Sequence, residues 1–379
     1  MARFAAAFND FLWNDVGPTR GLTDPRKQPR IKLETIVGSV ILLPLAGARS
    51  LLEIDLRLRD GARRYFGESV SDTHLTRVIG QLDLEELRII NRRVSEQGGG
   101  YRLESGRELN IGLVDGTSLG KHLVSAFQTV RSAVDRPLVD LEPSPGQGHE
   151  LATTARLINR VVHKTTRAWH LIGADGLYMT QGHMRQCLEL GVDFFVKTKE
   201  GTLTIVQEAK EIFRRKHLYS KDVECVEGAD EKRHIRWRVI AGSGFSFEGV
   251  DRELRVAWVE ETSTATGETE TFFVVTSRLD LTAEELRELG HLRWSIENHG
   301  FKLFNSLYAS KHGYIKDEAA SLRLVFLLAI GFNSLLRFLQ TKRREIDRHW
   351  RTAKVTLRNL ARFVLGQLLR ASRMIRAES

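Results

Sequence analysis

Two aspartates and one glutamate lie where a reaction on a phosphate could use their carboxylates. Asp115 and Asp175 each come directly after a short apolar run and directly before a glycine. Ligands of open α/β sheets gather beyond the carboxyl ends of strands, so both side chains are expected in one crevice, where glycine lets the chain turn sharply. For each aspartate alone, capping of the following loop is the better explanation. Two Asp-Gly pairs at strand ends, combined with Glu297 on a later predicted helix, indicate a functional site more specifically than either aspartate alone.

Three converging carboxylates without histidine or cysteine suit Mg²⁺, which prefers oxygen ligands and keeps several waters. Two such ions about 3.5–4 Å apart can stabilise the attacking and leaving oxygens of an in-line phosphoryl displacement. In that arrangement Asp115 would bridge both ions, and Asp175 and Glu297 would each complete one. The predicted metal ligands are therefore these three residues, with two Mg²⁺ ions, for which Mn²⁺ could substitute.

Arg293 stands four residues before Glu297, and positions four apart share one face of a helix. Thr282 and Glu285 open this helix with a capping box, and leucines at helical spacing continue it, which predicts one helix over 282–305. An exposed Arg–Glu pair would contribute only about 0.3–0.5 kcal/mol. With the two aspartates nearby, Arg293 would instead orient the Glu297 carboxylate or hold a DNA phosphate with its planar guanidinium.

The elements that must position these residues follow from apolar periodicity. An order of three strands, helix, strand, helix and strand over 109–197 is a mixed α/β pattern. The other predicted helices are 33–45, 51–59, 73–81, 84–94, 150–163, 180–190 and 318–339, with a basic amphipathic one at 355–369. The predicted strands are 109–114, 123–130, 137–141, 169–173, 193–197, 234–240, 254–260 and 272–277.

Changes of pattern at the glycine run 98–100 and near residue 200 divide the chain. Tight turns between the short N-terminal helices suit a helix-turn-helix with His74, Thr76 and Arg77 facing DNA, and a plain helical bundle explains them equally well. The expected segments are a helical, DNA-binding domain over 1–100, an α/β catalytic domain in two parts over 101–199 and 272–339, a β-rich insertion over 200–271, and a basic helical tail over 340–379.

The 379 residues carry a formal net charge of +9, and the whole excess lies near the C-terminal end. From Arg337 onward there are 12 Lys/Arg against 3 Asp/Glu, whereas the rest has 45 of each. Such a segment favours a polyanion, most simply nucleic acid, over a merely solvated helix. No apolar run reaches the roughly 20 residues of a membrane span, no signal-peptide pattern is present, and two distant cysteines suit a reducing cytoplasm.

Other polar residues near these segments have simpler explanations. His122, His149 and His183 are expected to be loop or surface residues rather than metal ligands. Glu150 fits two readings equally well: a group that supports the carboxylates from behind, and an acid favoured by the dipole at a helix N-terminus.

Three stretches resemble a known family. They are VDGT at 114–117, GADGLYMTQGHMRQCLELGVDFFVKTK at 173–199 and FFVVTSRLDLTAEELRELGHLRWSIENHGFKLF at 272–304. They are similar to the regions of the first Asp, the second Asp and the Arg-x-x-x-Glu motif in the DDE transposases of bacterial insertion sequences, of the IS-four-like type. Residues 23–27 and 45–51 also resemble the helical region before the catalytic domain in some of these enzymes. The resemblance implies an α/β, ribonuclease-H-like mixed sheet with flanking helices, a β-rich insertion before the last catalytic helix, and a helical N-terminal domain.

The family signature is Tyr-x-x-Arg-x-x-x-Glu, followed by six residues and a phosphate-gripping Lys. Arg293 and Glu297 match it, whereas Gly290 stands in place of the Tyr and Phe304 in place of the Lys. In relatives with a Glu-Asn-x-Gly-Phe version the Lys falls one place later, where this chain has Asn305. Lys302 lies near the missing lysine, on a different helical face. The candidate DNA contacts are Arg293, Lys302, Arg77, Lys342, Arg343 and Arg344.

The resemblance implies metal-dependent cleavage of DNA at the ends of an insertion sequence, followed by strand transfer. Hydrolysis would free a 3′-hydroxyl that attacks target DNA, and both displacements could use one metal site. The partner would be double-stranded DNA, as transposon ends and target, bound by a homodimer or higher assembly in the bacterial cytoplasm, associated with the nucleoid. The alternatives are a catalytically inactive, transposase-derived DNA-binding protein and an unrelated metal nuclease of the same fold.

Overall fold

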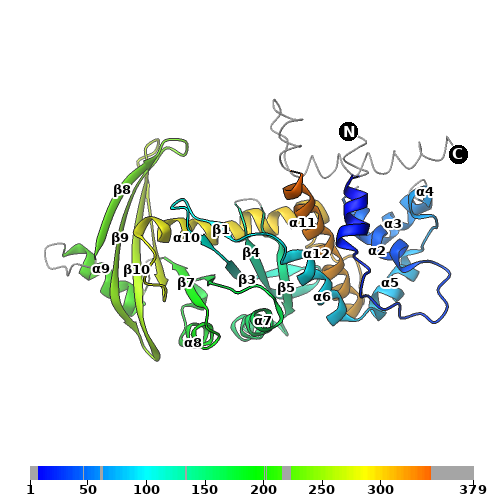
Figure 1. Ribbon diagram of the computed structural model, residues 1–379, viewed down its shortest axis with the longest axis horizontal. Helices are drawn as coiled ribbons and strands as arrows, with labels where there is room; N and C mark the ends of the chain where they lie inside the picture. The colour runs from blue at the N-terminus through cyan, green and yellow to red at the C-terminus, as the bar shows by residue number, and fades with distance from the viewer. Residues whose placement is uncertain are drawn as a thin grey trace.

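The computed structural model describes residues 7–45, 47–59, 63–132, 135–199, 201, 203–215 and 223–342. The molecule is elongated, with the strands of residues 224–263 at one end and the helices of residues 33–81 at the other (Figure 1). The helix α10 (Ala283–Ser295) runs along the molecule from the strand-rich end toward the middle. The sheet, α10 and the N-terminal helices together therefore set the long dimension.

The large sheet has nine strands in the described part of the chain, in the order β5-β4-β3-β6-β7-β11-β10-β9-β8. Strands β3, β4 and β5 pair antiparallel in turn, whereas β6 runs parallel to β3 and β7 parallel to β6. The expected mixed α/β, ribonuclease-H-like sheet is confirmed. These five strands are Ile111–Leu119 (β3), His122–Val130 (β4), Leu138–Pro143 (β5), Leu171–Asp175 (β6) and Asp193–Thr198 (β7).

The strands after residue 223 continue this sheet instead of forming a second one. β11 (Thr269–Thr276) pairs antiparallel with β7, and β10, β9 and β8 follow outward as a meander. The β-rich insertion before the last catalytic helix is thus present as expected, and it extends the catalytic sheet. The domain boundaries stay a prediction. The three outer strands are Glu224–Asp230 (β8), Ile235–Phe247 (β9) and Val250–Ser263 (β10).

The β-rich segment contains one helix that the sequence analysis does not predict. α9 (Thr204–Arg214) buries Ile205, Val206, Ala209 and Phe213, which recur at helical spacing, and packs on β9 and β10. The signal was present in the sequence, but its window is short and lies among strands.

Side chains alternate across the sheet and build two cores, one on each face. Leu113 and Phe195 belong to the core shared with α10 and the N-terminal helices. Their neighbours Val114 and Phe194 belong to the core that includes residues of α7 (Glu150–Lys164) and α8 (Gln181–Glu189). Whether a residue occupies an odd or even position on these strands therefore decides whether it faces α10 or α7.

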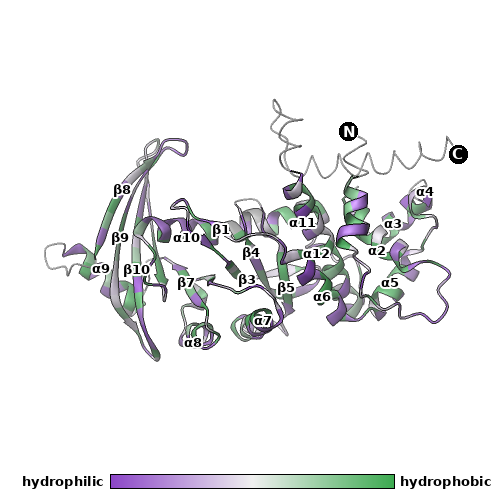
Figure 2. Cartoon of the chain, in the orientation of Figure 1, coloured by the Kyte–Doolittle hydropathy of each residue, from purple (hydrophilic) through white to green (hydrophobic). Residues whose placement is uncertain are grey.

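Three N-terminal helices, α2 (Leu33–Leu42), α5 (Asp72–Gln81) and α6 (Leu84–Ser95), pack against α12 (Glu318–Thr341). α2 is hydrophobic along most of its length (Figure 2). α12 is long and apolar enough to cross a membrane by length and composition, but it is mostly buried, as a core helix would be. The four predicted N-terminal helices are confirmed within a few residues, and the one predicted at 355–369 lies outside the described residues. The helices here are Leu33–Leu42 (α2), Leu51–Arg57 (α3), Arg63–Phe66 (α4), Asp72–Gln81 (α5) and Leu84–Ser95 (α6).

Asn333 of α12 links this helical layer to the edge strand β5. Its side chain accepts a hydrogen bond from the Leu138 N–H at 2.9 Å and donates to the Leu138 carbonyl at 2.7 Å. It also donates at 2.8 Å to Asn91 of α6, which in turn donates to the carbonyls of Leu138 and Val139. Both asparagines are fully buried, so these bonds satisfy polar groups that water does not reach.

We predict that Asn333→Ala destabilises the fold strongly. The change leaves the Leu138 N–H and the Asn91 side-chain oxygen without this partner, and an unpaired buried group costs about 1–3 kcal/mol. Urea unfolding would measure the loss. Gln340→Ala, at an exposed position of the same helix, is the matched control and should stay within about 0.5 kcal/mol of the unmodified protein. Equal stabilities of the two variants would contradict the role of Asn333.

Candidate active site

Asp115 and Asp175 lie level with each other on neighbouring parallel strands. The pairing of β3 with β6 matches Leu113 with Gly173, so the residues two positions later come at the same height. Because side chains alternate, both carboxylates point to the side of the sheet where Leu113 packs, which is the α10 side. The two aspartates therefore share one side of the sheet, and the crevice expected around them stays a prediction.

Asp115 itself does not stand at a strand end, contrary to expectation. β3 continues to Leu119, since residues 115–119 keep pairing with β4. Gly116 makes no turn here, and its lack of a Cβ lets the Glu150 carboxylate come close, since a Cβ there would lie 2.6 Å from one of its oxygens. The polar run after Val114 looks like a loop in the sequence, but it is part of an antiparallel ladder.

Asp175 does end its strand, and it plays two roles at once. Its Oδ1 accepts from the Leu177 N–H at 3.0 Å and caps the turn that follows β6. Its Oδ2 lies 3.0 Å from Nη2 of Arg293. Asp175 therefore caps the turn that follows its strand, and it also contacts Arg293. The two sequence interpretations of this residue do not exclude each other.

The helix that carries Arg293 and Glu297 is not a single α-helix over 282–305. α10 begins with the expected capping box of Thr282 and Glu285, passes into the π-helix η5 (Ile296–Phe301), and resumes as α11 (Lys302–Tyr308). π-helical turns are rare and occur often at functional sites. Here the π-helical turn contains Glu297.

Both departures from the family signature have packing reasons. A Cβ at Gly290 would lie 2.5 Å from Cε2 of Phe272 on β11, so a tyrosine fits there only if the helix or the ring moves. The Phe304 ring is fully buried, with its centroid 5.0 Å from that of Phe332 on α12. Glycine lets α10 approach the sheet, and Phe304 anchors α11 to the helical core.

One guanidinium joins all three predicted carboxylates. Nη2 of Arg293 lies 3.4 Å from Asp115 Oδ2 and 3.0 Å from Asp175 Oδ2, and Nη1 lies 3.0 Å from Glu297 Oε1. The side chain of Arg293 is only 5% exposed. The structure thus brings together the four residues predicted from the sequence. They lie on β3 (Asp115), on β6 (Asp175) and on the helical segment α10–η5 (Arg293 and Glu297).

Burial and charge make Asp115 unusual among the three. Its side chain is 11% exposed, against 39% for Asp175 and 54% for Glu297. Burial raises the pKa of Asp115 to about 7, Arg293 opposes this rise, and the charges of Asp175 and Glu297 add to it. Asp115 is therefore the carboxyl that exchanges a proton near neutral pH.

The donor set fits a divalent metal ion in its chemistry. Three carboxylates converge on one positive group, and all donors are oxygens, which hard cations prefer. In the part of the chain that the structure describes, no three acidic, histidine or cysteine side chains form a ready metal cage. The Arg293 guanidinium lies between the carboxylates, so metal binding requires it to withdraw from some of them.

Glu150 lies against β3 from the α7 side. The Tyr178 hydroxyl donates to Glu150 Oε1 at 2.8 Å and contacts Thr154 Oγ1 at 3.0 Å, and Thr154 donates to Ser125 at 2.8 Å. The charge of Glu150 also contributes to the raised pKa of Asp115. Glu150 is also the first residue of α7. Its position therefore suits both interpretations from the sequence, an acid at a helix N-terminus and a group behind the carboxylates.

Two of the three histidines are not on the surface, contrary to expectation. His122 begins β4 and His183 lies within α8, and both are less than a tenth exposed. Burial lowers the pKa of His183 to about 4, so this imidazole is neutral at physiological pH. His149, just before α7, is exposed as expected. The burial arises because His183 takes a core position against Tyr178.

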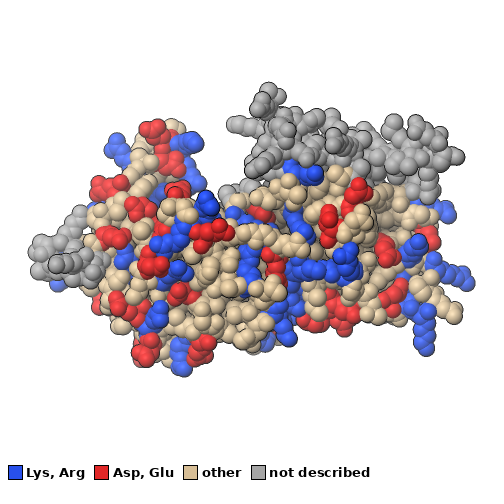
Figure 3. All heavy atoms as spheres, viewed as in Figure 1, with Lys and Arg blue, Asp and Glu red and all other residues tan. Residues whose placement is uncertain are grey.

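Among the other candidate DNA contacts, Lys302 lies five residues after Glu297, whereas Arg77 and Lys342 are distant from the carboxylates in the sequence. Lys302 is exposed at the start of α11, Arg77 is exposed on α5, and Lys342 follows α12. Arg343 and Arg344 lie outside the described residues. Figure 3 shows acidic and basic side chains interspersed on the visible face, so the charge pattern there does not mark a DNA path.

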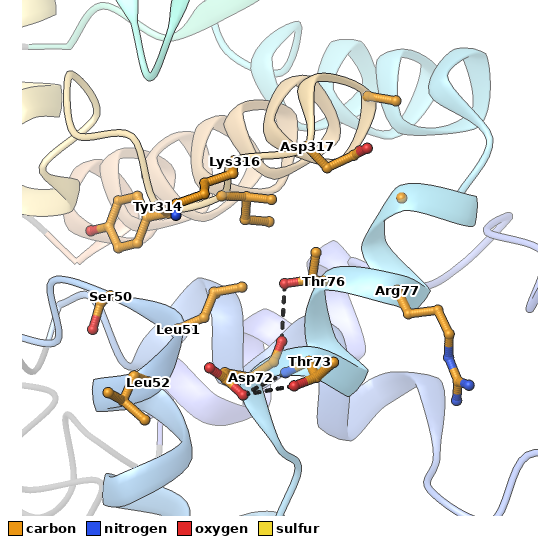
Figure 4. A pocket seen from close by; sticks show the side chains of 13 residues that line it. Ser50, Leu51, Leu52, Asp72, Thr73, Thr76, Arg77, Tyr314, Lys316 and Asp317 are labelled. Carbon is orange, nitrogen blue, oxygen red and sulfur yellow. Dashed lines mark hydrogen bonds between the residues drawn. The ribbon is translucent and has the colours of Figure 1, made fainter.

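A pocket of about 780 Å³ opens beside Arg77, between α3, α5 and the segment that leads into α12 (Figure 4). Its lining includes Asp72 and Asp317 as well as Lys316, so its charge is mixed. The guanidinium of Arg77 points away from the other labelled residues in Figure 4 and donates to His74 Nδ1 at 3.0 Å. The helix-turn-helix hypothesis stays a prediction.

Residues 111–332 match the family model described as a transposase DDE domain. No curated protein matches the sequence. Among solved structures, a piggyBac transposase in a synaptic complex with hairpin DNA is similar, with a TM-score of 0.48 and 10% identity, over 99% of this chain and 82% of that one. At that identity no residue role is carried over from it.

We predict that stability falls as the pH rises through the titration of Asp115. Burial raises the pKa of Asp115 from 3.8 to about 7, so the folded protein keeps a proton that the unfolded chain releases between these values. Folding is then favoured at low pH and loses up to a few kcal/mol by about pH 8. Urea unfolding with a metal chelator present, at about pH 5 and pH 8, measures this.

Asp115→Asn provides the control for this prediction. The variant removes the titrating group, so its stability should change less between the two pH values. Added Mg²⁺ should stabilise the unmodified protein at the higher pH through preferential binding to the folded state, and should do little for the variant. The same pH dependence in both proteins would contradict the assignment.

Proposed function

The chain belongs to the transposase DDE domain family, and from this premise we propose that it cleaves DNA at the ends of an insertion sequence and transfers the freed strand into target DNA. The observation that supports this most directly is the contact of the Arg293 guanidinium with Asp115, Asp175 and Glu297. Two strands and one helix each supply a carboxylate to one point, as in-line phosphoryl displacement requires.

We propose that Asp115, Asp175 and Glu297 would together hold two Mg²⁺ ions, for which Mn²⁺ could substitute. When bound, the ions would offset the charge on the attacking and leaving oxygens of the phosphodiester. Asp115 must first release the proton that its pKa of about 7 lets it hold, because only the carboxylate is a ligand. The activity should therefore fall below neutral pH.

The chain's own residues would position the phosphodiester. Arg293 would keep Nη1 on Glu297, at 3.0 Å in the present arrangement, and turn Nη2 from the aspartates to a non-bridging phosphate oxygen. Asp115 is buried and Glu297 is half exposed, so DNA would approach from the side of Glu297. Water would attack in the first displacement and the freed 3′-hydroxyl in the second.

We propose that the partners are double-stranded transposon ends and target DNA, bound by a homodimer or a higher assembly. Much of the affinity would come from phosphate contacts and would fall with salt. Lys302, Arg77 and the basic stretch at 342–344 are the candidate contacts. The bacterial cytoplasm, in association with the nucleoid, is the proposed location.

A second candidate is a transposase-derived protein that binds DNA without cutting it. Gly290 and Phe304 favour it, because neither position carries the side chain of the family signature. The packing of Gly290 on Phe272 and of Phe304 in the core gives both substitutions a structural reason. Metal-dependent strand cleavage by the unmodified protein would eliminate this candidate.

We predict that Asp115→Asn, Asp175→Asn and Glu297→Gln each abolish nicking of a duplex that carries the inverted repeat flanking the coding region. Loss of a ligand should exceed the roughly 10–100-fold cost of losing an outer partner of a metal site. Gel assays with Mg²⁺ would measure nicking, and a labelled target duplex would report strand transfer. Strand transfer distinguishes a transposase from a plain metal nuclease.

Glu284→Gln, at an exposed position of the same helix as Arg293, is the matched control and should nick like the unmodified protein. Each variant should still bind the duplex in the presence of a chelator. Cleavage retained by Asp115→Asn would rule out its assigned role. Salt-sensitive binding without any nicking by the unmodified protein would favour the inactive DNA-binding protein.

A further inference from the structure

The side chains of the proposed site carry more negative than positive charge, because three carboxylates contact one guanidinium. That guanidinium is 5% exposed. A backbone phosphate brings a further negative charge to the same place. The position at which the family signature has its phosphate-gripping lysine is occupied by Phe304, whose ring is buried in the helical core. Besides the proposed metal ions, a second cationic side chain beside the carboxylates would give the DNA backbone a contact that position 304 does not supply.

Lys197 lies at the right height and on the right face. It stands on β7, where it pairs in register with Asp175 on β6. Phe195, two residues earlier, belongs to the core on the α10 side, so alternation places Lys197 on that side as well. Both strands run parallel, so Lys197 and Asp175 point from neighbouring strands toward the space under α10.

Two aromatic rings hold the ammonium of Lys197. Its Nζ lies 3.9 Å from the ring centroid of Phe272 on β11 and 4.9 Å from that of Trp294 on α10. Trp294 follows Arg293 directly in the sequence. Phe272 is 5% exposed and Trp294 is 48% exposed, so the ammonium lies between a buried ring and an open one. Lys197 itself is partly exposed.

Contact with these two rings leaves the positive charge of Lys197 in place. Cation–π contacts orient an ammonium without neutralising it. A carboxylate would cancel the charge, but among the described residues the ammonium faces rings and no acidic partner within ion-pair distance. Burial lowers the pKa of Lys197 to about 8, which still leaves it protonated at neutral pH. Its N–H groups remain donors for an anion.

We propose that Lys197 contacts a DNA backbone phosphate beside the carboxylates and so supplies the positive charge that position 304 lacks. Phe272 and Trp294 are the positioning residues for its ammonium. The inference rests on the proposed function and adds to it the residue that holds the substrate next to the reacting phosphodiester. The sequence contained a signal for it, a lysine at an inward position of the apolar strand 193–197.

The test is the salt dependence of DNA binding. The probe is a fluorescein-labelled duplex with the inverted repeat that flanks the coding region, titrated with chelator present from about 50 to 200 mM salt. Lys197→Met keeps the apolar stem and removes the charge, so the slope of log affinity against log salt should fall by about 0.9, the value for one phosphate. Lys197→Arg should retain the slope of the unmodified protein.

Lys164→Met is the matched control, because Lys164 is exposed on α7, against the other face of the sheet. It should leave the slope unchanged. In cleavage assays Lys197→Met should raise KM for the duplex more than it lowers kcat. Thermal unfolding checks the fold of each variant. If Lys197→Met is unstable, two other variants test the role: Lys197→Arg should retain the salt slope, and Lys197→Gln should lose about 0.9 of it.

The outcomes separate this inference from the proposed function. Unchanged slopes for Lys197→Met, in a protein that binds and nicks the duplex, would overturn the role of Lys197 alone. A reduced slope that Lys197→Arg does not restore would also overturn it, because the role requires charge. An unmodified protein that neither binds nor nicks the duplex would overturn the proposed function itself.

Discussion

The arrangement of the site depends on the charge balance between one guanidinium and three carboxylates. Carboxylates that meet in a partly buried space repel one another, and each must be offset by a cation or hold a proton. Arg293 supplies the cation, within 3.4 Å of all three groups. Burial raises the pKa of the most buried carboxyl, Asp115, to about 7, and the charges of the other two carboxylates add to this rise against the opposing effect of Arg293. The same imbalance prepares the site for added positive charge.

The backbone features around the site serve this contact. The register of β3 with β6 brings Asp115 and Asp175 to one height, and Gly290 lets α10 lie close enough to the sheet for Arg293 to reach both. The π-helical turn after α10 then displaces the following residues relative to a regular helix, at the point where Glu297 stands. Changes far from the carboxylates could therefore disturb them by moving α10.

Much of the site could be predicted from the sequence, because its parts are local. The Asp-Gly pairs after apolar runs and the Arg-x-x-x-Glu spacing select the four residues that the structure brings together. The position of Asp115 within a strand was not predictable in this way, because pairing of residues 115–119 with β4 is a tertiary effect. The π-helix, the burial of His183 and the aromatic seat of Lys197 likewise depend on neighbours distant in sequence.

The continuous sheet also constrains the order in which the protein can assemble. β8 to β11 are joined by short connections and can form as a local meander, whereas β7 must wait for β11, which pairs Thr198 with Phe273 across the whole insertion. Closing so long a loop is slow compared with forming the meander. α10 packs on β11, so Arg293 reaches the aspartates only after that closure. A nascent chain still lacking β11 and α10 therefore carries two of the three carboxylates without their counter-ion, so the charge balance of the site is completed late in synthesis.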